Sequence, residues 1–141
     1  AWMREKGFTE AEDELGFVEE LLKSAKSKPI TANAEAPLRE IVTLMRNHGV
    51  SQVPLIERGK LNAIVHESDI LKRMEGGGLD LDAPATTAAS PIAGLIYPKA
   101  RLEELFHIFA TDHVAIVVDA SNVVGVISKI DLIEYLDRKS R

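Results

Sequence analysis

The chain contains no cysteine, which excludes disulfide bonds and thiolate chemistry. It also lacks a long apolar run: the longest stretches, residues 114–118 and 123–127, are far shorter than the roughly 20 residues that a membrane-spanning helix needs. The opening residues, Ala-Trp-Met-Arg-Glu-Lys, lack the apolar segment of a secretion signal. We therefore expect a cytoplasmic chain that does not enter a membrane.

Positive charge is in short supply as well. The 141 residues include 17 lysines and arginines against 22 acidic residues, which gives a net charge of −5. Because binding to a phosphate backbone depends on positive charge, this balance argues against a nucleic-acid partner. With 45% hydrophobic and 28% charged residues, the composition is that of a globular protein, and the length suits one domain or two small halves.

No set of side chains has the spacing of a catalytic or metal-binding motif. The four histidines are not spaced with acidic residues as metal ligands are (His48, His66, His107 and His113). The three glycines at 76–78 are not followed by the lysine and hydroxyl residue of a phosphate-binding loop. Without a candidate nucleophile and base, we predict no catalytic residue, no metal site and no enzymatic activity for this chain.

What the sequence does contain is an internal duplication, with a first half at 29–75 and a second half at 91–137. Each half has a proline followed by isoleucine, an amphipathic helix, two short apolar strands joined by a tight turn, and a closing helix. Asp69 and Asp131 lie 62 positions apart, as do Ala63 and Gly125. We predict an α/β fold of the α+β type: two pseudo-symmetric repeats, each a small sheet with flanking helices.

The pattern also predicts where the elements lie. The first helix of each half begins near Leu38 or Leu102. A second helix, with Asp69 or Asp131 in its first turn, closes each half. The predicted strands are residues 53–56 and 61–65 in the first half, and 115–118 and 123–127 in the second.

The remaining segments read as connections. Residues 9–24 carry apolar residues at helical spacing, so we predict a connecting helix within a linker at 1–28. Residues 76–90 join the halves, and the Ala/Thr/Pro-rich part at 82–90 predicts a flexible crossing. Residues 138–141 form a tail. Because the sequence opens with Ala-Trp, we expect the chain to have been cut from a longer protein.

The strongest candidate for ligand chemistry is the segment from Gly125 to Asp131. A glycine in a strand lets another group approach the backbone closely. Ser128 ends the strand, and the carboxylate of Asp131, in the first helical turn, could accept the hydroxyl protons of a ribose. The helix N-terminus could bind a phosphate oxygen. The same Ser-x-x-Asp pattern is also an ordinary capping box that needs no ligand.

The first half keeps part of this pattern. Asp69 remains, but Ala63 stands where the second half has Gly125, and His66 stands where it has Ser128. We therefore expect any site in the first half to be degenerate.

Several segments resemble a known family. They are residues 2–8 (WMREKGF), 48–54 (HGVSQVP), 94–97 (GLIY) and 112–118 (DHVAIVV). Residues 29–137 resemble a tandem CBS-domain pair, also called a Bateman module, and are most similar to the C-terminal regulatory region of cystathionine β-synthases. The resemblance implies a homodimeric regulatory module, with a fused catalytic domain that holds pyridoxal phosphate. It also implies an adenosine-containing effector, S-adenosylmethionine first and AMP or ATP next.

The resemblance implies ligand-binding residues on both halves. The second half would contribute Gly125, Val126, Ser128, Ile130 and Asp131, and the first half Pro29, Ile30, Val50, Ser51, Gln52, Val53 and Pro54. A degenerate second site would involve His66, Asp69, His113 and Ala115. Ser51 departs from the family members that respond to S-adenosylmethionine, which have an aspartate there. A serine offers an ammonium group only a neutral hydrogen bond.

Two alternatives stay open at this point. The chain could be a structural dimerisation module that binds no ligand, pairing through the amphipathic helices at Leu38–Arg46 and Leu102–Ala110 together with the closing helices. It could also be an AMP- or ATP-sensing pair that belongs to another enzyme.

Overall fold

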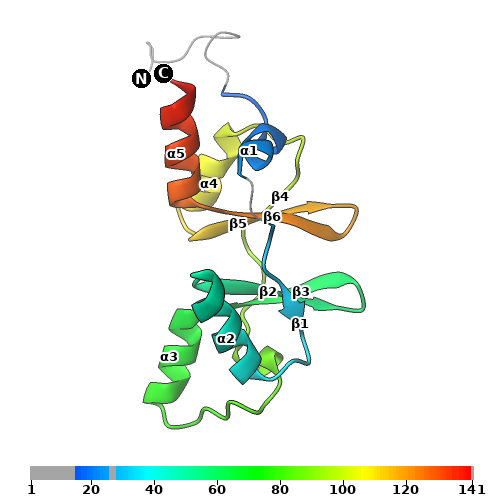
Figure 1. Cartoon of the computed structure of the whole chain (residues 1–141), viewed down its shortest axis with the longest axis vertical. Helices are drawn as coiled ribbons and strands as arrows, with labels where there is room; N and C mark the ends of the chain where they lie inside the picture. The colour runs from blue at the N-terminus through cyan, green and yellow to red at the C-terminus, as the bar shows by residue number, and fades with distance from the viewer. Residues whose placement is uncertain (1–14, 26–27, 141) are drawn as a thin grey trace. The chain divides into compact units, whose positions relative to one another are not determined.

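The computed structural model describes residues 15–25 and 28–140, which fold into two compact units (Figure 1). The first unit consists of Lys28–Ala93 and Asp119–Val124, and the described residues of the second unit are 15–25, Gly94–Val118 and 125–140. These described residues form two three-stranded sheets, with strand orders β1-β2-β3 and β4-β5-β6. The predicted fold class, a mixed α and β structure of two similar halves, is confirmed.

The first sheet is built from a parallel and an antiparallel pair. Its strands are β1 (Ala32–Asn33), β2 (Gln52–Glu57) and β3 (Lys60–His66), with β1 parallel and β3 antiparallel to β2. Helices α2 (Leu38–His48) and α3 (Glu67–Glu75) lie on the same side of this sheet (Figure 1). The strands and helices predicted for this half are confirmed, whereas the two-residue strand β1 was not predicted.

The core of the first unit follows from the helical spacing of α2. Leu38, Ile41 and Met45 recur on one face of the helix and are buried. They pack with apolar residues of the strands and of α3, namely Val53, Leu55, Val65 and Ile70. α2 ends at Gly49, whose φ of 65° is the left-handed conformation that glycine adopts most easily.

The segment before the second half belongs to this core too. Ala85–Ala88 form a short 3-10 helix, η2, with Ala85 and Ala88 buried against the first unit. The backbone N–H of Ala85 donates to the carbonyl of Ala36 at 2.7 Å. The expectation of a flexible crossing at 82–90 is therefore wrong. The small residues of this segment suggested a flexible linker, but two of its alanines are packed in a core.

The second sheet repeats the arrangement of the first. Its strands are β4 (Leu95–Ile96), β5 (Val114–Asp119) and β6 (Asn122–Ser128), with β4 parallel to β5, and all but the hairpin residues Asp119–Val124 belong to the second unit. Helices α1 (Val18–Ser24), α4 (Glu103–Phe109) and α5 (Lys129–Lys139) cover one side of the sheet (Figure 1). The predicted strands and the two predicted helices of this half are confirmed.

Helix α1 is an integral part of the second unit. Val18 is 0% exposed and Leu21 is 2% exposed, in a core that also contains Leu102, Leu105 and Ile127. The backbone reinforces this packing, since the N–H of Val18 donates to the carbonyl of Ala100 at 2.9 Å. The predicted helix is wrong at residues 15–17, which are not helical, and its residues 9–14 lie outside the described part of the chain.

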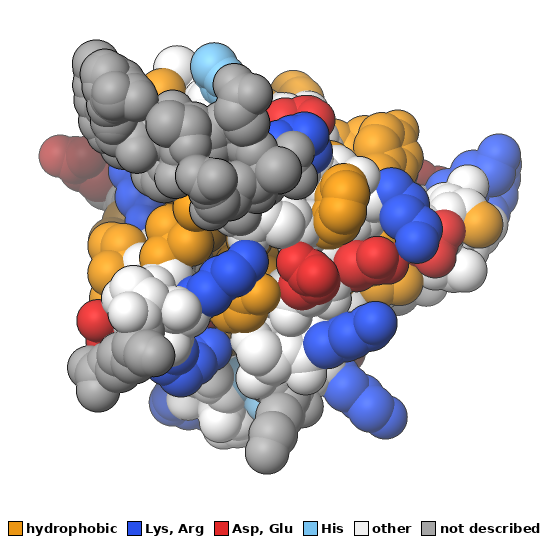
Figure 2. Space-filling model, turned by 90° about the horizontal axis from the view of Figure 1, so that it is seen from above, with side chains coloured by type: hydrophobic (Ala, Val, Ile, Leu, Met, Phe, Trp, Pro, Cys, Tyr) orange, Lys and Arg blue, Asp and Glu red, His pale blue; other side chains and the backbone are white. Residues whose placement is uncertain are grey.

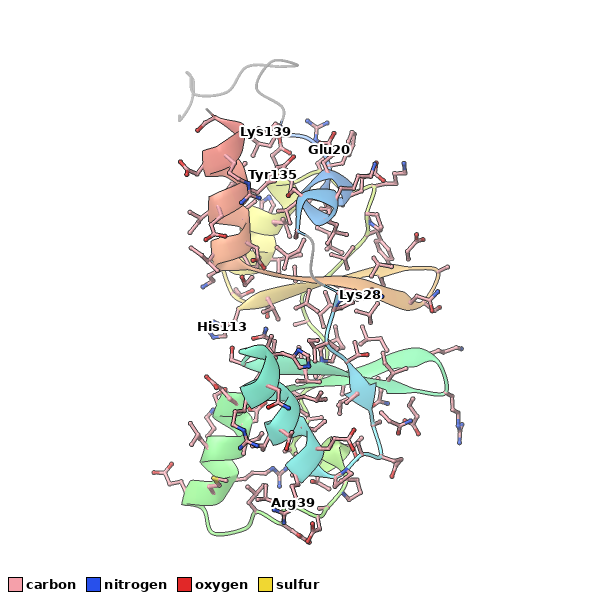
Figure 3. The ribbon with its side chains drawn as sticks, in the orientation of Figure 1. Glu20, Lys28, Arg39, His113, Tyr135 and Lys139 are labelled. Carbon is pink, nitrogen blue, oxygen red and sulfur yellow. The ribbon has the colours of Figure 1, made fainter. Side chains whose placement is uncertain are left out.

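The C-terminal turn of α5 contacts the start of this segment (Figure 3). Lys139 Nζ donates to the carbonyl of Leu15 and lies 5.8 Å from the ring centroid of Tyr135. Arg138 donates to Ser24 Oγ at 3.4 Å. Burial, and secondarily the negative charge of Glu20, raise the pKa of Tyr135 above its usual value of 10.0.

Both hairpins turn through left-handed residues. Arg58 and Gly59 join β2 to β3 with φ of 53° and 78°, and Ala120 and Ser121 join β5 to β6 with φ of 51° and 75°. Two consecutive positive φ angles are typical of the type I′ turn, whose twist suits two-residue hairpins. The tight turns predicted between the paired strands of each half are confirmed.

We predict that Gly94→Ala destabilises the chain. A Cβ at this position would lie 2.5 Å from the carbonyl oxygen of Val114, and backbone cannot rotate away as a side chain can. We expect a loss of about 1–3 kcal/mol in the free energy of unfolding, measured by urea denaturation. Gly78→Ala is the control, because its Cβ would meet no atom of the described residues within 4 Å. Equal losses for the two variants would contradict the close approach.

A second variant tests whether α1 belongs to the core. Leu21→Ala removes a fully buried side chain, so we expect a loss of about 2–5 kcal/mol in the free energy of unfolding. Lys23→Ala, at an exposed position of the same helix, should change stability by less than about 0.5 kcal/mol. If both variants unfold at the wild-type urea concentration, α1 is not a structural element of the unit.

Candidate functional site

The centre of the candidate site is the junction of β6 and α5, where the strand passes directly into the helix. The backbone N–H of Ser128 donates to Asp131 Oδ2 at 2.8 Å, and the N–H of Asp131 donates to Ser128 Oγ at 3.3 Å. This reciprocal pair is the capping box that the sequence left open as an alternative. Both side chains are half-buried, so the cap fixes the Asp131 carboxylate beside the helix N-terminus without enclosing it.

Gly125 has a packing reason for lacking a side chain. A Cβ there would lie 2.4 Å from Leu22 Cδ2, so α1 is packed directly over this part of β6. The sequence alone did not reveal this neighbour, which lies about a hundred positions away in the chain. Close approach to Gly125 therefore occurs within the protein itself, and a ligand contact at Gly125 stays a prediction.

Two apolar residues flank the capping pair. Val126 is half-buried in β6, and Ile130 is 55% exposed in the first turn of α5. An exposed isoleucine beside a carboxylate gives this junction a mixed character: a polar group for hydroxyls and an apolar surface for a flat ring.

The predicted ligand residues of the first half lie in and around the start of β2. Ser51 is exposed, and its Oγ donates to Gln52 Oε1 at 2.9 Å. Val50 is half-buried, whereas Val53 is fully buried and packs in the core of the first unit. Pro29 and Ile30 are half-buried, and Pro54 is buried. The side chain of Val53 thus serves the core.

Asp69, the counterpart of Asp131, has a partner that the sequence did not indicate. Ser90 Oγ donates to Asp69 Oδ2 at 2.8 Å. Ser90 is held in place by Ile64, with which it exchanges two backbone hydrogen bonds of 3.0 and 2.7 Å. The sequence signal for Ser90 was weak: a hydroxyl residue directly before the proline that opens the second half.

The other residues of the predicted degenerate site belong to two different units. His66 is half-buried at the N-cap of α3, where its side chain makes no capping hydrogen bond. In the second unit, His113 is exposed just before β5, and Ala115 is fully buried in the core (Figure 3).

Residues 15–25 and 28–140 lack two features that would point to other functions. They contain no cluster of three or more histidine, aspartate or glutamate side chains placed to hold a metal ion. Every helix in this part of the chain falls short of the length and apolar character that crossing a bilayer requires.

Comparison with known proteins identifies the family of this chain. The CBS domain family model matches residues 18–76 and 93–138. A curated relative, the CBS domain-containing protein YhcV of Bacillus subtilis (strain 168), is 27% identical over 104 residues, which are 72% of this chain and 74% of YhcV.

Solved structures agree on the fold. The CBS domain protein PAE2072 from Pyrobaculum aerophilum, complexed with AMP, is 25% identical with a TM-score of 0.74, covering 89% of this chain and 99% of that one. The CBS domain pair of protein MJ0100, in complex with 5′-methylthioadenosine and S-adenosyl-L-methionine, is 19% identical with a TM-score of 0.74, covering 87% and 97%. With both halves matched by the family model and the two sheets matched by these structures, the chain belongs to the CBS-domain family as a tandem pair.

Proposed function

We propose that this chain is a regulatory module that binds an adenosine-containing small molecule through the junction of β6 and α5. The observation that carries the proposal is the reciprocal bonding of Ser128 and Asp131. It holds a carboxylate at a helix N-terminus with acceptor capacity left over, since an ionised carboxylate offers about four lone-pair sites. Asp131 would accept the ribose hydroxyls, and Ile130 would contact an apolar face of the ligand.

The ligands of two similar structures support an adenosine core. PAE2072, at 25% identity, was solved with AMP, and MJ0100 with 5′-methylthioadenosine and S-adenosyl-L-methionine. These three ligands share adenosine and differ in what is attached to it. At Ser51 the present chain offers a neutral hydroxyl, which does not favour the ammonium group of S-adenosylmethionine as a carboxylate would.

Regulation requires that the ligand favour one arrangement of the module over another. We propose α1 as the element that transmits the change, because Leu22 contacts Gly125 in the strand that leads to Ser128 and Asp131. If β6 moved when a ligand bound, the contact between Gly125 and Leu22 would move α1 as well. Attachment to a pyridoxal-phosphate-dependent cystathionine β-synthase rests on the sequence resemblance and stays a prediction.

Thermal unfolding with S-adenosylmethionine, AMP, ATP or no ligand tests the proposal. A ligand at 100 times its dissociation constant should stabilise the chain by about 2.7 kcal/mol. Asp131→Asn keeps an oxygen for the N–H of Ser128 but removes the charge, so we expect at least about a tenfold loss of affinity. Glu134→Gln, an exposed carboxylate of the same helix, is the matched control and should bind as wild type does.

Each result of this series has a distinct meaning. Stabilisation by S-adenosylmethionine alone identifies a sensor of sulfur metabolism, and stabilisation by AMP or ATP identifies a nucleotide sensor. Unchanged affinity in Asp131→Asn would refute the site. If none of the three compounds shifts the unfolding temperature, the proposal is wrong and the dimerisation alternative takes its place.

We also propose that the module forms a homodimer through its closing helices. Each unit exposes large apolar residues there: Leu71 (63%) and Met74 (49%) on α3, and Ile133 (60%) on α5. Figure 2 shows the molecule from above, where apolar side chains lie among charges of both signs; α3 is not on this face. Exposed apolar residues concentrated on a helix are typical of an interaction surface.

Analytical ultracentrifugation checks the dimer. We expect wild type to sediment as a dimer, and Leu71→Glu and Ile133→Glu to shift the equilibrium toward monomer by at least about tenfold, because each would bury an unpaired charge. Lys72→Glu changes charge beside Leu71 without removing an apolar contact and should leave the dimer in place. A wild-type chain that is monomeric would rule the dimer out.

A further inference from the structure

Two basic side chains in the last turn of α5 contact the two ends of the segment that contains α1. Lys139 Nζ donates to the carbonyl of Leu15, just before the helix, and Arg138 donates to Ser24 Oγ at 3.4 Å, where the helix ends. One turn of α5 therefore holds the connecting segment at both of its ends.

The start of α1 leaves room for the ammonium group of Lys139. A Cβ on Gly16 would lie 3.1 Å from Lys139 Nζ, and the φ of 103° at this residue is a conformation that glycine adopts easily. The ammonium group also lies 5.8 Å from the ring centroid of Tyr135, whose π face attracts a cation. Beside it, Glu20 accepts the backbone N–H of Phe17 at 3.0 Å, which closes the first turn of α1 (Figure 3).

The backbone attachment of the connecting segments is the same on both units. In each unit, the segment makes two backbone hydrogen bonds with the residues at the start of the first helix of the half. They run from Leu38 N to Ala83 O and from Ala85 N to Ala36 O in the first unit, and from Leu102 N to Gly16 O and from Val18 N to Ala100 O in the second. The first unit therefore provides an internal comparison for the second.

The closing helices differ where the two basic side chains lie. Helix α3 ends at Glu75, whereas α5 continues to Lys139. The offset of 62 between the halves pairs Arg138 with Gly76 and Lys139 with Gly77, and a glycine has no side chain to reach a neighbouring segment. The contacts from α5 are thus an addition of the second half to an attachment that both halves share.

We propose that Arg138 and Lys139 form a latch that sets how readily α1 leaves the second unit. A helix of seven residues is too short to be stable by itself in water, so α1 depends on its attachment. Elements of this kind open locally while the rest of a protein stays folded. Opening of α1 breaks both contacts of the latch, so their removal makes opening easier. The latch thereby controls the mobility of the element proposed above to transmit regulation, and it acts whether or not a ligand is bound.

Amide hydrogen exchange, followed residue by residue by NMR, measures this opening. The two reporters are the hydrogen-bonded N–H groups of Val18 and Ala25, one at each end of α1. Arg138→Met/Lys139→Met removes the donors and leaves unbranched apolar chains, so we expect both reporters to exchange at least about threefold faster. The N–H of Ala85, which makes the matching bond in the first unit, should exchange as it does in wild type.

Lys72→Met/Arg73→Met is the matched control. It removes the same two charges from the last turn of α3, where both side chains are exposed. Both reporters should exchange at the wild-type rate in this variant. If they exchange faster by the same factor as in the α5 variant, net charge and not the latch sets the opening. Unchanged reporters in the α5 variant would also overturn the inference, and so would an equal rise at Ala85.

A double-mutant cycle tests the contact at the end of α1. Ser24→Ala removes the acceptor of Arg138 without changing α5, and it also removes the bond that Ser24 Oγ donates to the carbonyl of Leu21. We expect Arg138→Met to speed exchange at Ala25 in the wild-type chain but not in Ser24→Ala, because the contact is already lost there. The same factor in both backgrounds would show that Arg138 does not act through Ser24, and the latch would be wrong.

Discussion

The structure depends on one constraint: each half of the duplication is too small to bury enough apolar surface for a stable core by itself. Each half therefore takes in a segment from outside its own repeat. The first unit buries Ala85 and Ala88, which precede the second half, and the second unit buries Val18 and Leu21, which precede the first half. The two connecting segments are exchanged, and each completes the core of the half that it does not lead into.

This exchange explains which features the sequence could predict. The strands, the closing helices and the spacing of Leu38, Ile41 and Met45 follow from local periodicity, and they lie where the pattern places them. The roles of α1 and η2 depend on neighbours far away in the chain. A short run of alanines and threonines has no periodicity, so nothing local distinguished η2 from a flexible linker.

The candidate site shows the same division. The sequence located Ser128 and Asp131 and gave two interpretations of them, cap and ligand site, and the structure shows the cap. The two interpretations are compatible, because a capped carboxylate is held in one orientation and loses little entropy when a ligand binds. Leu22 over Gly125 and Ser90 on Asp69 could not be predicted, since each contact joins an exchanged segment to a half that it does not precede.

The exchange also makes the two halves chemically different while their folds remain alike. The two connecting segments pack on different halves and contact different residues. Ser90 arrives on the first unit as part of one segment, whereas α1 reaches the second unit as part of the other and contacts β6 at Gly125. A ligand at Asp131 would then act on the strand that α1 contacts, and a ligand shifts an equilibrium only by its difference in affinity between two states.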